Sequence, residues 1–272
     1  MNNASCSWPL PEDVATAIKR SIDSPPLFFN RATGGADTRD EIRKTLAEIL
    51  HCEKDEISLV SGATAGLNVA ILGLKLKKGD TIVTTDAEHN SVYRPLQKFL
   101  EFNPDNNLVN ISCNHEGVPS FDEFKKFTES KDGSSFKVLV MSSLSNVTGR
   151  YTGWKEFFKL AKSRGVTTLL DASQSFGKTQ TGVDEYIHAD IVVAPSHKGI
   201  RSLQGLGFLK IFSTIQIRQI ISGGTGTESY SLTHPKIMPE KFEAGTPHYT
   251  GSIAMLKALM WGKENSNIFS SR

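Results

Sequence analysis

The stretch Asp190-Ile-Val-Val-Ala-Pro-Ser-His-Lys198 decides the fold. Its apolar run, 191–194, is short and ends abruptly in Pro-Ser-His-Lys, which is typical of a strand buried on both faces. Polar residues at the carboxyl end of such a strand lie where open α/β sheets bind ligands. Partial desolvation lowers the pKa of a lysine amine and frees it to attack a carbonyl. Lys198 is therefore either a lysine that forms a Schiff base or a surface lysine just past a strand end.

Two earlier stretches repeat this design. Thr167-Thr-Leu-Leu-Asp-Ala-Ser-Gln174 runs apolar and then places an acid and an amide, and Val138-Leu-Val-Met-Ser-Ser-Leu-Ser-Asn146 ends in an amide. Parallel strands would bring their carboxyl ends to one edge of the sheet. The residues expected there are Asn146, Asp171, Gln174, His197 and Lys198. This set suits a planar, anionic, nitrogen-containing cofactor that carries an aldehyde.

Apolar periodicity and turn residues alternate between strand and helix along the chain. Strands are predicted at 57–60, 81–84, 108–113, 137–142, 167–171, 190–194 and 206–211. Helices are predicted at 11–21, 38–50, 92–100, 121–128, 154–163 and from 253 to 261, with a further helix ending at 76. We expect Thr38 to cap the second helix and Asp86 or Ser91 to cap the helix from 92. The alternation predicts an α/β fold with a doubly wound, mostly parallel sheet.

A turn of small residues, Ser61-Gly-Ala-Thr-Ala-Gly66, follows the first strand and opens a helix. Such a turn leaves backbone N–H groups free and lets a phosphate approach closely. The alternative is an ordinary strand-to-helix turn. The turn is therefore a candidate phosphate site rather than an established one.

Composition limits the classes of function. With 272 residues, of which 38% are apolar, the chain can bury a sizeable core. A net charge of +2 argues against a nucleic-acid or membrane partner, and no apolar run is long enough for a bilayer. The three cysteines form no disulfide framework or CxxC pair, and no metal site is expected. No secretory signal is visible, so we expect a cytoplasmic protein.

Three motifs together resemble the signature of the class V aminotransferase family, in its cysteine desulfurase and selenocysteine lyase branch. They are Asp171-Ala-Ser-Gln174, Ser196-His-Lys198 and Phe242-Glu-Ala-Gly-Thr-Pro247. The resemblance runs from about residue 3 to about residue 258. It implies the fold-type I architecture, the cofactor pyridoxal 5′-phosphate (PLP) and a homodimer. It also implies an amino-acid substrate, cysteine or selenocysteine, and a sulfur-acceptor protein.

The resemblance also implies roles for single residues. Lys198 would hold PLP as a Schiff base and move protons at the substrate α-carbon. Asp171 would pair with the pyridine nitrogen, and His89 would stack on the ring as an acid or base. Gln174 would bind the ring hydroxyl oxygen, and Asn146 would help to fix the ring.

The phosphate contacts implied by the resemblance come from Ala63, Thr64, Ser196 and His197, with Thr246 reaching the phosphate of the partner subunit. The family usually has a small hydroxyl residue where this chain has Pro195. The resemblance also places the carboxylate-binding arginine and the nucleophilic cysteine in a C-terminal small domain, which is largely missing here.

Three segments follow from this comparison. Residues 1–15 would form a leader that borders the site, 16–250 the PLP-binding large domain, and 251–272 the start of an interdomain helix with a polar tail. The expected reaction converts cysteine to alanine plus enzyme-bound sulfur. Two alternatives stay open: an aminotransferase or epimerase of the same family, or a truncated, catalytically impaired remnant that binds PLP or dimerises.

Overall fold

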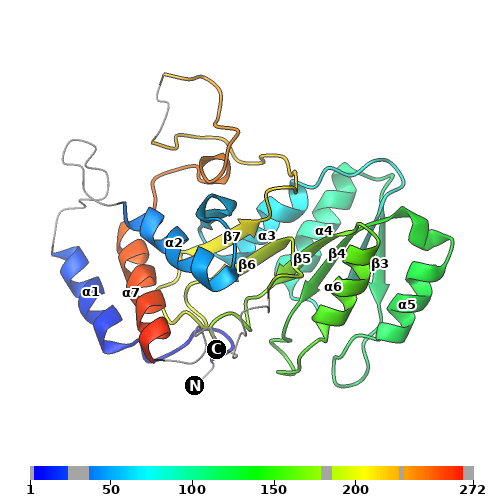
Figure 1. Cartoon of the computed structure of the whole chain (residues 1–272), viewed down its shortest axis with the longest axis horizontal. Helices are drawn as coiled ribbons and strands as arrows, with labels where there is room; N and C mark the ends of the chain where they lie inside the picture. Colours follow the sequence, from blue (N-terminus) through cyan, green and yellow to red (C-terminus); the bar gives the residue numbers. More distant parts are fainter. Residues whose placement is uncertain (1–2, 24–36, 179–185, 227–229, 266–272) are drawn as a thin grey trace.

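The computed structural model describes residues 3–23, 37–178, 186–226 and 230–265, which build one seven-stranded sheet between layers of helices (Figure 1). The predicted tail therefore lies outside the described residues from 266 onward. The strands are β1 Ile57–Val60, β2 Thr81–Thr85, β3 Asn107–Ile111, β4 Phe136–Ser142, β5 Thr167–Asp171, β6 Ile191–Pro195 and β7 Gly207–Ile211. Each predicted strand is present, with its ends shifted by two residues at most.

The sheet has the strand order β1-β7-β6-β5-β4-β2-β3. Neighbouring strands from β6 through β5, β4 and β2 to β3 pair in parallel. Strand β7 is antiparallel to both β6 and β1, so it alone is reversed among the described strands. The prediction of a mostly parallel α/β sheet is confirmed.

The helices are α1 Glu12–Ile22, α2 Thr38–Leu50, α3 Ala63–Leu72, α4 Asn90–Phe102, α5 Phe121–Glu129, α6 Trp154–Ser163 and α7 Tyr249–Asn265. Both predicted caps were wrong. Asp37 caps α2 by accepting from the N–H of Arg39, because the residue before the first helical turn is the one in extended conformation. His89 caps α4, and its ring Nδ1 accepts from the N–H of Ser91 at 3.0 Å.

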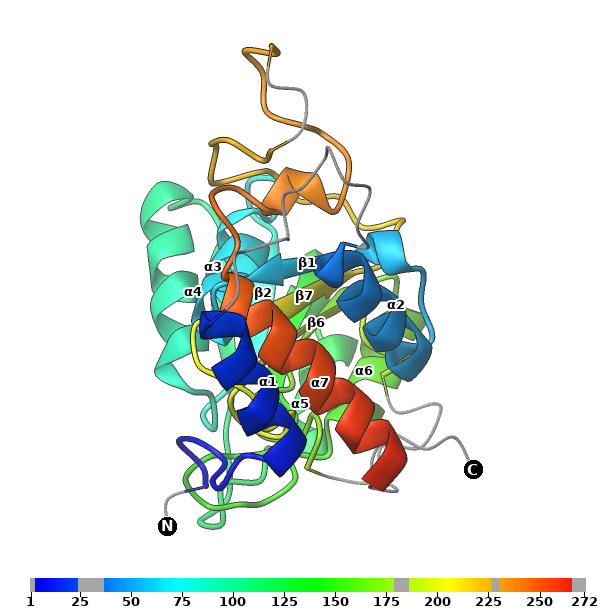
Figure 2. The same cartoon turned by 90° about the vertical axis from the view of Figure 1, so that its left-hand side faces the viewer.

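Two apolar clusters cover the two faces of the sheet, and successive residues of a strand contribute to opposite clusters. In β6, Val192 and Ala194 join the cluster formed with α2, α5, α6 and α7, while Ile191 and Val193 join the one formed with α3 and α4. The strand is therefore buried on both faces, as its unbroken apolar run predicts. Helix α1 packs beside α7 (Figure 2).

No helix in the described part of the chain is both long and apolar enough to cross a bilayer.

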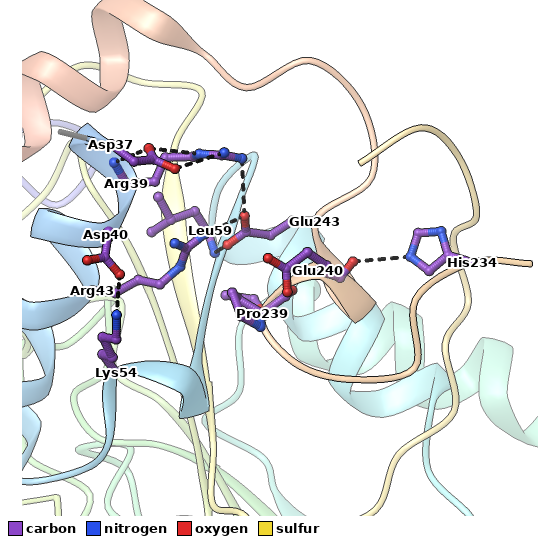
Figure 3. Close-up of polar contacts among 11 residues, drawn as sticks. Asp37, Arg39, Asp40, Arg43, Lys54, Leu59, His234, Pro239, Glu240 and Glu243 are labelled. Atoms are coloured by element: carbon purple, nitrogen blue, oxygen red, sulfur yellow. Dashed lines mark hydrogen bonds and ion pairs between the residues drawn. The ribbon is translucent and has the colours of Figure 1, made fainter. Parts of the chain in front are cut away.

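A carboxylate clips the segment around Glu243 to the open edge of β1 (Figure 3). Glu243 Oε1 accepts from the backbone N–H of Leu59 at 2.7 Å, and Oε2 accepts from Arg43 at 2.6 Å. Arg39 lies 3.7 Å from the same oxygen. Both partners of the Arg43–Glu243 pair are buried, with side chains less than a tenth exposed. Strand β1 leads directly into the turn at Ser61, so this clip also steadies the approach to the site.

Candidate functional site

The carboxyl ends of β4, β5 and β6 border a cavity of about 310 Å³. Register places Ser142, the last residue of β4, beside Asp171, the last residue of β5. The lining residues are Ser61, Gly62, Ala63, Thr64, His89, Ser91, Ser142, Leu144, Asn146, Asp171, Ser173, Gln174, Pro195, His197 and Lys198. Eight of the ten residues predicted for the site are among them, and Ser196 and Thr246 are not. We call this cavity the strand-end pocket.

Lys198 enters the strand-end pocket from the turn that follows β6. Burial lowers the pKa of its amine, and the nearby carboxylate of Asp171 opposes this effect without reversing it. The turn has no room for a side chain at Gly199, because a Cβ there would lie 2.0 Å from the carbonyl oxygen of Phe176. The lysine therefore stands on a turn that is packed tightly against its neighbour, with a partly desolvated amine.

Asp171 is 5% exposed, and its Oδ1 accepts from the N–H of Ser173 at 2.9 Å. One buried carboxylate oxygen is thus tied to the backbone of the following turn. Because the carboxylate also influences Lys198, the acid and the amine are part of one electrostatic unit. This arrangement suits a bound group that presents a protonated nitrogen to the carboxylate.

His197 carries a polar atom that lacks a partner. Its Nδ1 is buried and makes no hydrogen bond to the described residues. Burial, reinforced by the charges of Lys198 and Lys178, lowers the pKa of the imidazole. Because Nδ1 is buried, the ring meets the strand-end pocket through its other atoms.

The amino end of α3 forms the opposite wall. Gly62, at φ 127°, adopts a conformation that suits glycine, and no side chain caps the helix. The first N–H groups of the helix, beginning at Ala63 and Thr64, are thus available to an anion. This geometry favours the phosphate interpretation of the turn over that of an ordinary connection.

Hydroxyl groups join this wall to the predicted ring-stacking histidine. Ser91 Oγ lies 2.8 Å from Thr64 Oγ1 and 3.0 Å from His89 Nδ1. Because Nδ1 also accepts from the N–H of Ser91, the neutral ring carries its proton on Nε2. His89 is thereby both a helix cap and an oriented side chain of the pocket.

The sequence analysis missed several lining residues, notably Ser91, Ser142 and Ser173. Each directly follows or lies near a residue that was singled out, but serine is too common beside strand ends to be selected by type. Spacing after His89 gave the best signal for Ser91, which we had considered only as a cap.

The assignment of Ser196 to the cofactor was wrong in geometry. Its side chain is fully buried, and its hydroxyl donates to the carbonyl oxygens of Leu203 at 2.5 Å and Leu206 at 2.8 Å. The hydroxyl therefore closes the turn between β6 and β7 and faces away from the pocket. Pro195, which replaces the expected hydroxyl residue, lines the pocket instead.

Thr246 lies in a second cavity of about 190 Å³, which shares Ser61 with the strand-end pocket. The structure does not bring Thr246 together with Lys198 in this chain. Its contact with a partner subunit stays a prediction.

Gln174 lines the strand-end pocket, but both ends of its amide have protein partners. Nε2 donates to the carbonyl oxygen of Ala4 at 2.8 Å, and Oε1 accepts from Lys178 at 2.9 Å. One N–H and one lone pair of Oε1 remain for a ligand. The glutamine can thus donate to the ring hydroxyl oxygen that the resemblance implies, while its acceptor oxygen is shared with the ammonium of Lys178.

A buried acid lies behind the pocket. Glu88 is 8% exposed and accepts from the N–H and Oγ of Ser142, at 2.8 and 2.6 Å, and from Thr85 Oγ1 at 2.7 Å. Burial raises its pKa to about 7, although these hydrogen bonds oppose the shift. The carboxyl therefore changes charge near neutral pH, one residue from His89.

Glu88 should make the stability of the protein depend on pH. Its pKa is higher in the folded state than the ordinary value of 4.5, so folding favours the protonated acid. The free energy of unfolding should fall as pH rises from about 4.5 to 7, by roughly 3 kcal/mol at most, and then level. Urea unfolding at pH 5.5 and 8 should show about 2 kcal/mol of this loss in the wild type and a smaller loss in Glu88→Gln. The exposed Glu129→Gln is the control, and an equal slope in all three proteins contradicts the assignment.

The strand-end pocket fits PLP by the chemistry of its donors. The uncapped end of α3 suits a phosphate, Asp171 suits a pyridine nitrogen, and Lys198 suits an aldehyde. These groups surround one cavity, so a single molecule could meet them all.

Comparisons with known proteins agree with this chemistry. The family model for aminotransferase class-V matches residues 30–269. The chain is 32% identical over 231 residues to a probable cysteine desulfurase of Pyrococcus abyssi, covering 82% of this chain and 55% of that protein. It is 29% identical to the cysteine desulfurase IscS of Dictyoglomus turgidum, covering 94% and 61%.

An apo structure of the cysteine desulfurase from Thermococcus onnurineus NA1 superimposes with a TM-score of 0.84 at 27% identity, covering 98% of this chain and 67% of that one. The chain spans about half the length of the curated relatives it matches. The family match covers most of the chain, and its fold and motifs agree with it. The chain belongs to the class V aminotransferase family, whose cofactor is PLP.

Proposed function

We propose that this chain forms the PLP-binding part of a cysteine desulfurase, which converts cysteine to alanine and transfers the sulfur to a thiol. The observation that carries the proposal is the strand-end pocket, where Lys198 and Asp171 meet the uncapped end of α3. Relatives named as cysteine desulfurases support the choice of substrate.

When bound, PLP supplies an aldehyde that takes the substrate amine and a ring that draws electrons from the α-carbon. Lys198 would supply the amine that holds the cofactor, and its lowered pKa would let it accept a proton from the substrate α-carbon. Asp171 would pair through its buried carboxylate with a protonated ring nitrogen. His89, oriented by Ser91, offers Nε2–H toward the pocket.

None of the three cysteines of this chain lines the strand-end pocket. Burial raises the pKa of Cys52 to about 12 and also raises that of Cys113, so neither thiol is a ready nucleophile. Cys6 lies in the leader, where its sulfur accepts from Gln204 at 3.5 Å. We therefore expect this chain alone to activate the substrate α-carbon more readily than it removes sulfur.

The proposal is tested with purified chain, PLP and L-cysteine in D2O. We expect a visible absorption band on adding PLP, exchange of the α-proton followed by NMR, and little sulfide. Alanine and sulfide released together would extend the activity to the whole desulfuration. A chain that gives neither band nor exchange contradicts the proposal.

The second candidate is an aminotransferase of the same family. The matching family model supports it, because that model describes aminotransferase class-V. The same incubation with 2-oxoglutarate added as the amino acceptor distinguishes the two, since the 2-oxo acid derived from cysteine would then accumulate in place of alanine.

Further elements of this proposal are a homodimer, a sulfur-acceptor protein and a cytoplasmic location. Thr246 in its exposed segment supports the dimer, since it lies outside its own strand-end pocket. The relatives include a mitochondrial and a mitosomal form, so location is to be tested by fractionation.

A further inference from the structure

The backbone of residues 3–9, the first described part of the predicted leader, is hydrogen-bonded to residues of the strand-end pocket. The N–H of Ser7 donates to the carbonyl oxygen of His197 at 3.0 Å. The amide of Gln174 donates to the carbonyl oxygen of Ala4 at 2.8 Å. The leader therefore depends on two pocket residues, and their positions depend on the leader in turn.

Lys178 joins the same contact and is not part of the pocket lining. Its Nζ donates to Gln174 Oε1 at 2.9 Å and to the carbonyl oxygen of Asn3 at 2.9 Å. Lys178 lies four residues after Gln174, in the turns that follow β5. The ammonium of Lys178 thus connects the amide of Gln174, a pocket residue, with the backbone of Asn3.

These contacts determine which way the amide of Gln174 faces. An ammonium has donors only and a carbonyl oxygen accepts only. Rotating the amide by half a turn would place Nε2 against Lys178 and Oε1 against the carbonyl oxygen of Ala4, which are two unfavourable contacts. Lys178 therefore fixes Oε1 as the acceptor of its own hydrogen bond and leaves the second N–H of Nε2 as the donor that Gln174 can offer to a ligand.

The turn that carries Lys178 is rigidly placed against the turn that carries Lys198. A Cβ on Gly199 would lie 2.7 Å from the carbonyl carbon of Gly177, so the two backbones touch. Burial and the charge of Lys198 lower the pKa of Lys178, and the charge of Lys178 contributes to the lowered pKa of His197. Lys178 therefore acts on the pocket at short range.

We propose that Lys178 is a positioning residue of the PLP site, which orients the amide of Gln174 as a donor and fastens residues 3–7 beside the pocket. This inference rests on the proposed binding of PLP. The chemistry required at position 178 is a side chain that only donates hydrogen bonds.

The test compares Lys178→Met, Lys178→Arg and the control Lys159→Met, which removes an exposed lysine of α6. PLP should dissociate about tenfold faster from Lys178→Met than from wild type, the effect of one hydrogen bond. Its visible band should also shift, because the donor to the ring oxygen is no longer fixed. Arginine also only donates hydrogen bonds, so Lys178→Arg should bring the dissociation rate most of the way back to the wild-type value. Lys159→Met should resemble the wild type.

Hydrogen exchange of a peptide that covers residues 3–10, measured without PLP, tests whether Lys178 fastens residues 3–7 beside the pocket. Exchange should be faster in Lys178→Met than in Lys159→Met. If the wild type gives no PLP band, the proposed function fails, and so does the inference that Lys178 orients Gln174 toward the cofactor. Hydrogen exchange still decides whether Lys178 fastens residues 3–7. If the wild type binds PLP but Lys178→Met matches Lys159→Met in dissociation, band and exchange, the inference alone is overturned.

Discussion

Replacing Lys198 by alanine should abolish the covalent attachment of PLP. In the wild type, borohydride reduction should fix the cofactor on one peptide, the one that contains Lys198. The partly buried amine of this lysine has a lowered pKa and lies in the strand-end pocket with Asp171. Lys198→Ala should show no label above background and no visible band characteristic of the bound form.

Peptide mapping supplies the sharpest control. Burial also lowers the pKa of Lys210, on β7, but this lysine lies outside the pocket and donates to the carbonyl oxygen of Ala189 at 3.2 Å. Desolvation alone would label both lysines, whereas the pocket geometry predicts Lys198 only. Label on Lys210, or label retained by Lys198→Ala, contradicts the assignment. The exposed Lys159→Ala should be labelled like the wild type.

The largest effect on stability should come from Glu243→Ala. This change removes the partner of Arg43, whose guanidinium is buried and whose Nε already has no hydrogen bond to the described residues. Leaving a buried charge uncompensated costs about 3–5 kcal/mol in free energy of unfolding. The N–H of Leu59 would lose its acceptor as well. Urea unfolding should give this loss, with a matching fall in the thermal midpoint.

Two further variants serve as controls for the unfolding measurement on Glu243→Ala. Glu101→Ala removes an exposed ion pair with Lys98 and should cost no more than about 1 kcal/mol. The double variant Arg43→Met with Glu243→Leu should lose less than Glu243→Ala, because no buried charge remains. A loss in Glu243→Ala no greater than in Glu101→Ala would show that the buried pair does not stabilise the fold.

The parts of the structure that depend on local pattern could be predicted from the sequence. The bounds of α2 and α6 match the predicted ranges, because apolar periodicity defines both helices and glycines flank α6. The buried strands β5 and β6 could be predicted for the same reason. Their polar ends then indicated Asp171, Gln174, His197 and Lys198 as neighbours, which the strand-end pocket confirms as a matter of position.

The errors arose where the hydrogen-bond partners of a side chain, and not its residue type or its place in a motif, decide its role. The hydroxyl of Ser196 faces the turn at Leu203 and Leu206, a choice set by the reversal of β7 rather than by the motif itself. The cap of α4 fell to His89 because its ring could accept from Ser91, although histidine is an uncommon cap. Neither hydrogen bond could be predicted from residue composition or spacing.

The hydrogen bond from Leu59 to Glu243 has a consequence for association. A strand at the margin of a sheet is a template on which another chain can add a strand. Here the backbone N–H of Leu59 already donates to the carboxylate of Glu243, and the hydroxyl of Ser58 donates to the carbonyl oxygen of Pro239 at 3.0 Å. The segment 239–243 therefore covers the edge of the sheet at β1. We therefore expect two copies of this protein to meet through side chains and loops, and not by joining their sheets across β1 into a continuous ribbon.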